Sequence, residues 1–558
     1  MNTIEIIIEN NNQRVDIKQG TSLAELAKKY STLCQYPILG ALVNNEISPL
    51  DYRIYNPKCI RFIDITDRQG LRMYNRSVIF MLYKALHDVF PQATLRVEHS
   101  TLCGTFCYVE GLEESGITPI EIARQVRDRM SELQQADLPF EHKTMLLKEA
   151  LELLDHAPAT KQLLGDLSQL YITMQSLDGI THKLATKLVP STGCLTVWDF
   201  RPYADGFLIQ SPDFNHPGML SLYQETPKLF SIFREHYRWA KLLQVPNIAK
   251  LNETIRAKQE NHLIHVAEAL HEKKYAAIAD EIYQRRDEVK MVLLAGPSSS
   301  GKTTSCRRLA VQLSVLGFDV HQISLDDYFL ARDLTPRLPN GDYDFEFLEA
   351  LDIPLLNDHM QRLFNGEEVK MPTYNFITGK PEYRGNTLCL QPRNGKQPIL
   401  IAEGIHALNP KLTAQIDDKL KFKVYVSALT QISIDDQNII HTSDNRLIRR
   451  IVRDNNFRGY SALDTLKRWE SVRHGEELHI FPFQEEADAM FNSALLYELA
   501  LLKPYAEPLL KRVPENCPEY AEARRLLDFL EMIEPIDPKH IPPTSILREF
   551  LGGSSFEY

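Results

Sequence analysis

The sequence predicts an α/β fold with a parallel sheet over residues 289–510, preceded by a small β-rich unit and an α+β unit. Three observations lead to this prediction. A glycine-rich loop at residues 296–303 lies between an apolar run and a segment with helical spacing. Apolar runs alternate with helical patterns after residue 289, which is typical of a parallel sheet. Residues 1–66 contain short runs of partly alternating hydrophobicity, as short strands do.

Composition excludes several classes of protein. The chain has 558 residues, of which 44% are hydrophobic and 25% charged, so we expect several globular domains. No apolar run approaches the ~18 residues of a membrane span, and the acidic, partly alternating N-terminus is not typical of a signal peptide. Eight scattered cysteines are consistent with reduced thiols, so we expect a cytoplasmic protein. The net charge of −11 argues against broad nucleic-acid binding but leaves a local basic groove open.

Residues 1–66 have the pattern of a β-grasp unit. Two short strands at 4–8 and 14–17 flank an asparagine turn, which predicts a hairpin. Ser22 and Glu25 have the spacing of a capping box, so a helix begins there. Residues 41–43 and 60–64 are expected to form later strands. This pattern resembles the TGS domain of threonyl-tRNA synthetases and some GTPases, which implies a β-grasp fold.

Residues 70–235 resemble the second additional domain that follows TGS in threonyl-tRNA synthetases. A helix at 77–89 and the segment 188–193 carry the likeness. In that family the first helix supplies an H-x-x-x-H pair for metal or editing chemistry. Here the helix has only His87, so the pair is missing. Cys194 and His182 are candidates for remaining metal ligands, but structural roles are favoured for both. We expect a scaffold or a substrate cover.

The next two segments are predicted mainly as helices. Residues 236–288 have helical apolar spacing and form a connector. After the α/β unit, residues 511–558 are expected to contain a helix at 518–533. Prolines 535, 538, 542 and 543 then predict an irregular tail.

The sequence Gly-Pro-Ser-Ser-Ser-Gly-Lys-Thr at 296–303 is a complete phosphate-loop motif. Its glycines let backbone N–H groups point at phosphate oxygens at a helix N-terminus. Lys302 is expected to reach the β- and γ-phosphates, and the Thr303 hydroxyl to hold Mg²⁺. The alternative is an unrelated glycine-serine loop. The predicted ATP contacts are Gly296, Pro297, Ser298, Ser299, Ser300, Gly301, Lys302, Thr303 and Thr304.

Acidic residues follow two predicted strands. Asp326 comes directly after the strand at 319–325, and Glu403 follows the strand at 398–402. Groups just past the ends of parallel strands line the ligand crevice. A carboxylate there accepts the proton of an attacking hydroxyl or positions Mg²⁺. The alternatives are a solvated acidic turn for Asp326 and a strand-ending acid without a role for Glu403.

Four arginines have the spacing of one helix face: residues 446, 449, 450 and 453. Like charges at this spacing repel, which makes sense if a polyanion lies against them. Arg458 follows. The alternative is a solvated face paired with Asp454 and other acids.

The order of these motifs resembles the uridine kinase and phosphoribulokinase family over about 200 residues. The likeness includes the phosphate loop, Asp326-Asp-Tyr-Phe, Tyr343-Asp-Phe-Glu-Phe, Pro372-Thr-Tyr-Asn-Phe, Glu403-Gly and Arg449-Arg-Ile-Val-Arg-Asp. It implies Asp326 as catalytic base, with Lys302 and Arg453 also catalytic. It further implies Asp344 on ribose hydroxyls, Tyr374 and Phe376 around a nucleobase, and Arg449 and Arg458 near the phosphates.

Two departures concern the acceptor. The family usually has a histidine shortly after the Tyr-x-Phe motif, but Ile377-Thr378-Gly379 follows here. The segment after Asp344 lacks the usual His-Pro. Base selection is therefore expected to differ while the ribose end is kept.

The sequence favours an ATP- and Mg²⁺-dependent kinase that phosphorylates a hydroxyl of a nucleoside or a related small polyol. The alternative is an RNA- or tRNA-linked regulator, although eight basic and eight acidic residues through Gly70 give no electrostatic footprint for RNA. A translation GTPase is disfavoured because no N-K-x-D motif occurs. Homo-oligomerisation is left open.

Overall fold

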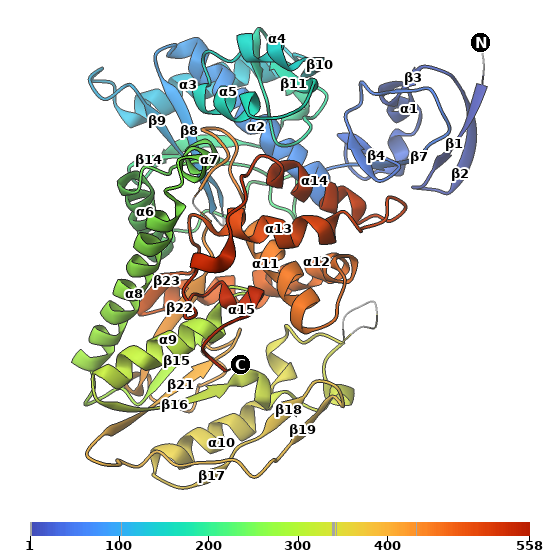
Figure 1. Ribbon diagram of the computed structural model, residues 1–558. Coiled ribbons are helices and arrows are strands. Elements are labelled where there is room, and N and C mark those ends of the chain that lie inside the picture. Colours follow the sequence, from blue (N-terminus) through green and yellow to red (C-terminus); the bar gives the residue numbers. More distant parts are fainter. Residues whose placement is uncertain (1–2, 102, 338–340, 342, 431, 558) are drawn as a thin grey trace.

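The structure is a computed structural model that describes residues 3–101, 103–337, 341, 343–430 and 432–557 (Figure 1). The N-terminal unit projects from one side of the molecule, and the units that follow it are packed together. Among the described residues, no helix combines the length and the apolar character needed to cross a membrane.

The N-terminal unit is a five-stranded sheet in the order β2-β1-β7-β4-β5. Its strands are β1 (Thr3–Ile8), β2 (Gln13–Lys18), β4 (Gly40–Val43), β5 (Glu46–Ser48) and β7 (Cys59–Ile63). β1 pairs parallel with β7 and antiparallel with β2, so the predicted hairpin is present. The Ser22 side chain caps α1 (Leu23–Lys29) by accepting from Glu25 N. The short β3 (Thr21–Ser22) and β6 (Arg53–Ile54) pair beside it. The TGS-like assignment stays a prediction.

The second unit is built around α2 (Arg68–Val89), which begins nine residues before the predicted start at 77 because Asp67 caps it. A four-stranded sheet has the order β13-β14-β9-β8, and a three-stranded sheet has the order β10-β11-β12. These strands are β8 (Thr94–Thr101), β9 (Gly104–Glu110), β10 (Glu141–Leu146), β11 (Tyr171–Leu177), β12 (Ile180–His182), β13 (Asp199–Tyr203) and β14 (Gly206–Gln210). The unit's other helices are α3 (Pro119–Gln135), α4 (Leu147–Glu152) and α5 (Pro158–Gly165).

Three helices connect this unit to the next: α6 (Pro227–Leu242), α7 (Ile248–Arg256) and α8 (Glu260–Gln284). Ile278 and Ile282 of α8, which the spacing singled out, are buried. They belong to one hydrophobic core with the sheet and helices that follow.

The third unit contains a five-stranded sheet in the order β16-β21-β15-β22-β23, and all its pairs are parallel. Its strands are β15 (Met291–Ala295), β16 (Phe318–Ser324), β21 (Gln397–Glu403), β22 (Lys421–Ser427) and β23 (Ala489–Asn492). β15 is fully buried, as expected for an apolar strand covered on both faces. The predicted parallel sheet is confirmed, with two strands that the sequence had not singled out.

Helices cover both faces of this sheet (Figure 1). They are α9 (Lys302–Val315), α10 (Ile353–Phe364), α11 (Thr442–Phe457), α12 (Ala462–His479) and α13 (Glu498–Leu510). Two small hairpins, β17 (Val369–Lys370) with β20 (Thr387–Leu388) and β18 (Thr373–Asn375) with β19 (Lys380–Glu382), extend the region that carries α10.

Between α14 (Tyr520–Leu530) and the short α15 (Arg548–Leu551) the tail is irregular, as predicted, with a short 3-10 turn at Pro538–His540, but it is also packed. After α14, the chain returns to the sheet and forms α15. Ile546, Leu547 and Phe550 have 0% exposure because they enter the same core as the sheet. Their apolar side chains, spaced within one turn, hold the tail against α11 despite the prolines before them.

Candidate active site

The phosphate-loop motif forms a tight turn between β15 and α9. Gly296 has no room for a side chain, because a Cβ there would overlap the carbonyl oxygen of Val426. Gly301 has φ +81°, and a Cβ on it would lie 2.5 Å from Cδ1 of Ile546. Both glycines are therefore required by this geometry. α9 begins at Lys302, so the loop ends at a helix N-terminus, which favours anions.

Two side chains of the loop have partners inside the site. Lys302 Nζ donates to the Pro297 carbonyl oxygen at 3.1 Å. The Thr303 hydroxyl donates to Oε1 of Glu403 at 3.2 Å. Thr303 and Glu403 come from different strand ends, and the parallel pairing of β15 and β21 brings them together.

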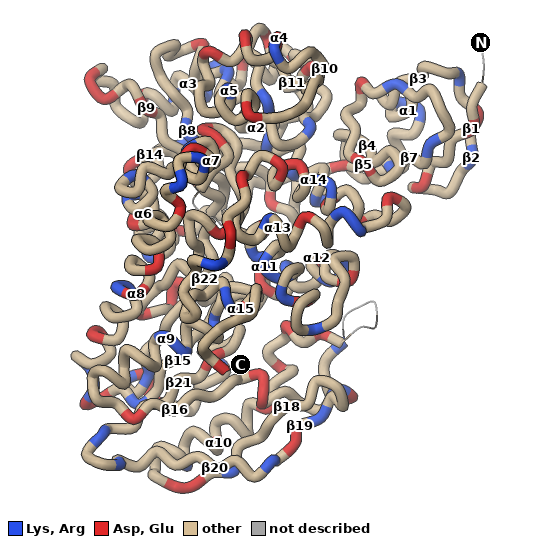
Figure 2. The backbone as a smooth tube through the Cα atoms, in the orientation of Figure 1, with Lys and Arg blue, Asp and Glu red and all other residues tan. Residues whose placement is uncertain are grey.

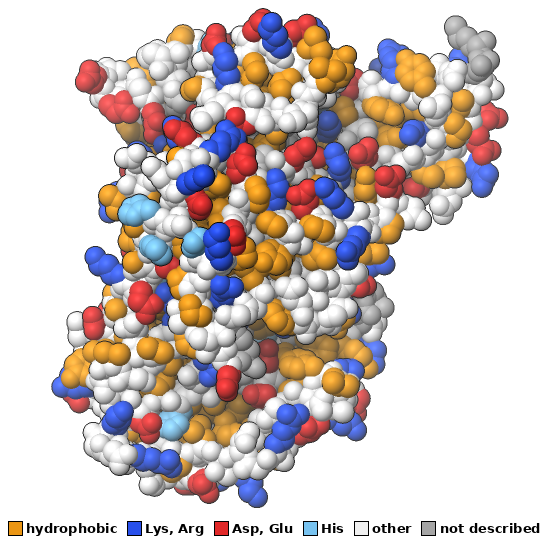
Figure 3. All heavy atoms as spheres, viewed as in Figure 1, with side chains coloured by type: hydrophobic (Ala, Val, Ile, Leu, Met, Phe, Trp, Pro, Cys, Tyr) orange, Lys and Arg blue, Asp and Glu red, His pale blue; other side chains and the backbone are white. Residues whose placement is uncertain are grey.

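A pocket of about 990 Å³ opens beside this loop, and we call it the nucleotide pocket. It lies where the surface is hollowed between the region of α10 and the C-terminal tail (Figure 3). Its walls carry four acids and four arginines: Asp326, Asp327, Glu403, Glu549, Arg307, Arg453, Arg458 and Arg548. Of the residues predicted from the sequence, Thr303, Asp326, Glu403, Arg453, Arg458 and Phe376 line this pocket.

Asp326 lies at the C-terminal end of β16, in the short helix at Leu325–Tyr328. Its side chain is exposed in the pocket, but neighbouring protein groups desolvate the carboxyl. Desolvation raises the pKa of the Asp326 carboxyl, and the positive charges of Lys302, Arg458 and Arg453 act in the opposite direction. The predicted base and three predicted cations are thus electrostatic neighbours.

Glu403 has a pKa raised to about 7 by desolvation, against the lowering effect of Lys302. The carboxylates of Asp326 and Glu549 raise it further. The Thr303 hydroxyl and the Glu403 carboxylate supply hard oxygen atoms, which Mg²⁺ prefers. The mutual repulsion of these carboxylates is what a divalent cation relieves, so the residues fit the predicted metal.

Arg453 and Arg458 are positioned by a buried acid. Asp454 is 3% exposed, and its Oδ1 accepts from Nε and Nη2 of Arg453 at 3.0 and 2.8 Å. Arg458 Nη1 lies 3.7 Å from the same oxygen, and Arg450 Nε lies 3.3 Å from Oδ2. Asp454 therefore holds three guanidinium groups near the pocket.

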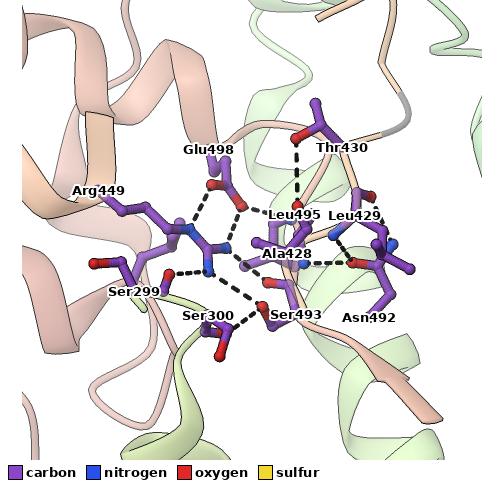
Figure 4. Close-up of polar contacts among 12 residues, drawn as sticks. Ser299, Ser300, Ala428, Leu429, Thr430, Arg449, Asn492, Ser493, Leu495 and Glu498 are labelled. Carbon is purple, nitrogen blue, oxygen red and sulfur yellow. Dashed lines mark hydrogen bonds and ion pairs between the residues drawn. The ribbon is translucent and has the colours of Figure 1, made fainter. Parts of the chain in front are cut away.

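Arg446 and Arg449 differ from the prediction of a single arginine face. Arg449 is fully buried and donates to Glu498 at 2.7 and 2.6 Å and to the Ser493 carbonyl at 2.8 Å (Figure 4). Its Nη1 also reaches the Ser299 carbonyl at 3.4 Å. These hydrogen bonds use the donors of the Arg449 guanidinium group, which is buried beneath the phosphate loop. Arg449 is therefore not placed to contact a substrate.

Arg446 has the same kind of environment. It is 1% exposed and forms a two-pronged pair with Glu476, and its Nη1 donates to the Ser298 carbonyl at 3.1 Å. Glu476 in turn accepts from Ser298 N at 3.1 Å. Arg446 and Arg449 are therefore buried between α11 and the phosphate loop. They support the loop by donating to its carbonyl oxygens.

Asp344 and Tyr374 are not among the residues that line the nucleotide pocket. Asp344 Oδ1 accepts from the backbone N–H of Glu346 at 3.0 Å. Tyr374 is 4% exposed, and its ring packs 5.0 Å from that of Phe376, centroid to centroid. Phe376 is 60% exposed and lines the pocket. Packing in the core thus takes Tyr374 away from the solvent and leaves Phe376 as the accessible aromatic ring.

Sequence reasoning gave no role to Glu346. Its Oε2 is buried without a hydrogen-bond partner among the described residues. Desolvation raises the pKa of Glu346 to about 7, while Arg450 and Lys302 lower it and Glu476 and Asp326 raise it. Its place two residues after Asp344, within a motif already noted, was the available signal.

Glu549 was also missed, and it makes a notable contact. Its Oε2 accepts from the Thr304 N–H at 3.2 Å and from the Thr304 hydroxyl at 2.7 Å. The carboxylate therefore accepts from an N–H in the first turn of α9, where an anion is favoured. No local signal could have found this contact between residues 245 positions apart.

The candidate metal ligands of the second unit have other surroundings. His182 is 1% exposed, and its ring centroid lies 6.2 Å from that of Tyr83. Cys194 Sγ lies 3.7 Å from the Ser191 hydroxyl oxygen. Within the part of the chain that the structure describes, no three His, Cys, Asp or Glu residues are grouped to hold a metal ion.

The phosphate loop follows the carboxyl end of β15, the central strand of the parallel sheet, and an acid and arginines surround one pocket beside it. This arrangement defines the class of P-loop phosphotransferases. Comparisons with known proteins agree with this class. Residues 291–498 match the model of the phosphoribulokinase/uridine kinase family.

Individual relatives match about a third of the chain. The uridine kinase of Borrelia duttonii is 28% identical over 38% of this chain and 93% of its own length. The uridine kinase of Staphylococcus haemolyticus is 30% identical over 32% of this chain and 75% of its own length. Among solved structures, D-glycerate 3-kinase from Cryptococcus neoformans is similar over 46% of this chain and 87% of that one, with a TM-score of 0.21 and 14% identity.

The chain belongs to the phosphoribulokinase/uridine kinase family. It is a phosphotransferase with an alcohol acceptor, so the predicted enzyme class is confirmed. The family match lies in the third unit and does not extend to the first two.

Proposed function

We propose that this enzyme transfers the γ-phosphoryl group of ATP to a hydroxyl of a uridine- or cytidine-like nucleoside or a related small polyol. One observation carries the proposal: Asp326, Thr303, Glu403, Arg453 and Arg458 line the same pocket beside the phosphate loop. Lys302 and the two arginines act on the charge of Asp326. The residues proposed to act on the attacking hydroxyl and on the transferring phosphoryl group therefore line the same pocket.

Asp326 has the role of the general base. Phosphoryl transfer is catalysed mainly by positioning and electrostatic stabilisation, with an acid that accepts the hydroxyl proton. The upward shift in its pKa improves Asp326 as a proton acceptor near neutral pH. Positive charge near the carboxylate favours its ionised form, which accepts a proton.

Lys302, Arg453 and Arg458 balance negative charge on the transferring group. Guanidinium groups bind phosphate through two parallel hydrogen bonds, and Asp454 orients Arg453 for such a contact. Thr303 and Glu403 are the residues proposed to hold Mg²⁺, which neutralises charge on the phosphates when it is bound. Glu403 is also held by the Thr303 hydroxyl.

Phe376 supports a flat acceptor. Its ring is exposed in the pocket, and aromatic faces stack well on planar bases. The missing histidine after this position and the missing His-Pro after Asp344 favour a base preference unlike that of usual uridine kinases.

The preceding units are proposed to be a TGS-like domain over 1–66 and a synthetase-like domain over 70–235. A helical connector at 236–288, the kinase domain at 289–510 and a C-terminal segment at 511–558 complete the division. We propose that the synthetase-like domain is a scaffold or a substrate cover, because its first helix has only His87 in place of the H-x-x-x-H pair.

The test is a screen of nucleosides, sugars and polyols for acceptor-dependent ADP formation from ATP and Mg²⁺ by the purified full chain. The Lys302→Ala variant serves as the blank, and Lys396→Ala, which removes an exposed lysine, serves as the matched control. A nucleoside should give turnover in the wild type and the control and none in the blank. Equal ADP formation by Lys302→Ala would contradict the assigned site.

A further inference from the structure

A second pocket lies between the synthetase-like unit and the kinase unit, and we call it the interdomain pocket. Its volume is about 320 Å³. Side chains from α2, β11, the segment 183–187, the start of α11 and α14 line it. It shares no lining residue with the nucleotide pocket. Its size is at the lower end of the range for small-molecule sites.

Positive charge predominates in the interdomain pocket. Its lining includes six cationic and three acidic side chains: Arg72, Arg76, Lys183, Lys187, Arg524, Arg525, Asp444, Asp528 and Glu531. The whole chain has a net charge of −11, so this local excess runs against the composition. Along the backbone, basic and acidic residues alternate where α14 lies near α2 (Figure 2).

Three of the four arginines of this pocket are paired with acids, whereas Arg76 donates to the Gln437 carbonyl oxygen at 2.7 Å. Arg525 donates to Asp444 at 2.8 and 2.7 Å and to Glu522 at 2.7 Å. Arg72 Nη2 donates to the same Glu522 at 3.2 Å. Arg524 Nε lies 3.3 Å from Asp528 Oδ1. The pairs of Arg72 and Arg525 connect α2, α11 and α14.

Lys183 and Lys187 are different. Among the described residues neither ammonium group has an ion-pair partner within 4.0 Å. Desolvation and repulsion from Lys187 lower the pKa of Lys183 to about 8, opposed by Asp528. Two lysines that repel each other in a concave site are stabilised by an anion between them.

A neutral acceptor lies in the same pocket. Oδ1 of Asn75 on α2 is buried and has no hydrogen-bond partner within the described part of the chain. A ligand with a hydroxyl group beside its anionic group would satisfy this oxygen as well as the lysines.

We propose that the interdomain pocket binds a small phosphate monoester, with its dianion held by Lys183 and Lys187 and a hydroxyl group available to Asn75. A phosphate monoester carries close to two negative charges at neutral pH, which matches the two unpaired lysines. The small volume favours such a molecule over an RNA chain.

The test is calorimetric titration of the full chain with ribose 5-phosphate, and with ribose as the neutral probe. Lys183→Met/Lys187→Met should weaken binding of ribose 5-phosphate by about a hundredfold, because each lost charged contact contributes about tenfold. Lys28→Met/Lys29→Met, which removes two adjacent exposed lysines on α1, is the matched control and should bind normally. ATP binding should be unchanged in both.

Lys183→Arg/Lys187→Arg should keep most of the affinity, which separates lost charge from lost folding. The thermal unfolding of each variant is followed by circular dichroism, and the single variant Lys187→Gln replaces the double variant if that one does not fold. Unchanged affinity in the methionine variant, or equal binding of ribose and ribose 5-phosphate, overturns the proposal. Binding of tRNA that displaces ribose 5-phosphate and is lost in the same variant would assign the pocket to RNA instead.

Discussion

The nucleotide pocket and the interdomain pocket lie at opposite ends of α11, and they differ in how their charges are paired. Asp444 near the start of this helix lines the interdomain pocket, and Arg453 near its end lines the nucleotide pocket. The nucleotide pocket has equal numbers of acids and arginines on its walls, whereas cations outnumber acids by six to three in the other.

This difference shows that a cation is available to a ligand only when no acidic side chain of the protein already pairs with it. The number of cations in a pocket does not decide this. In the nucleotide pocket Asp454 orients Arg453 and Arg458, and Glu549 covers the first turn of α9. In the interdomain pocket two lysines are left without an acidic partner of their own. Arg446 and Arg449 of α11 are buried and paired with Glu476 and Glu498. Their remaining hydrogen bonds go to the phosphate loop and not to a ligand.

The largest expected effect is on Asp326. Asp326→Asn removes the proton acceptor but keeps the shape of the side chain, so kcat should fall by about 10²–10⁴-fold. The affinity for ATP should change little, because the role proposed for Asp326 is toward the acceptor hydroxyl and not the nucleotide. Turnover by coupled ADP release and nucleotide affinity by calorimetry measure the two effects separately. A similar loss in both would place Asp326 in nucleotide binding instead.

The next effect concerns the buried arginines. Arg449→Met leaves the Glu498 carboxylate buried without its partner, so the free energy of unfolding should fall by about 3–5 kcal/mol. Arg458→Met, on a side chain that is 52% exposed, should cost less than about 1 kcal/mol. Urea unfolding of both variants measures this. Equal costs for the two would remove the distinction between bracing and pocket-facing arginines.

A smaller effect is the pH dependence of the interdomain pocket. The pKa of Lys183 is lowered to about 8, so its positive charge is lost as the pH rises through that value. Asp528 opposes this shift, and Lys187 and four arginines are the other cations that line the pocket. Binding of ribose 5-phosphate should therefore weaken by up to about tenfold from pH 7 to 9. Calorimetry of the wild type and Lys183→Arg checks it, and the arginine variant should show a flatter profile.

The smallest effect concerns the C-terminal tail. Glu549 lies at the N-terminus of α9, where a carboxylate is stabilised by about 0.3–1 kcal/mol. A phosphate that uses the Thr304 N–H must displace it, so Glu549→Gln should tighten ATP binding about two- to fivefold. Glu557→Gln, an exposed acid of the same tail, is the control. Weaker ATP binding in Glu549→Gln would mean that the tail helps to form the nucleotide site.

Much of the kinase unit could be predicted from the sequence because its signals are local. The phosphate loop and the acids after β16 and β21 depend on backbone geometry and strand order, which nearby residues determine. The positions of Asp326 and Glu403 at one pocket follow from them. Their roles in catalysis stay predictions that the proposed experiments address.

Other features depend on burial, which residues far apart in the chain decide. Helical spacing alone places Arg446, Arg449, Arg450 and Arg453 together, yet Glu476 and Glu498 from other helices draw two of them into the core. The same holds for Tyr374, which packing removes from the pocket, and for Glu549, which the C-terminal fold returns to α9.

The sequence by itself determined the phosphate loop, the parallel sheet and the acids at its edge, because each follows from the conformation of a few consecutive residues. Only the tertiary structure decided which arginines face a ligand, what covers the loop and where two unpaired lysines meet. Those outcomes depend on desolvation and on charge partners from distant segments, and neither is encoded in local spacing.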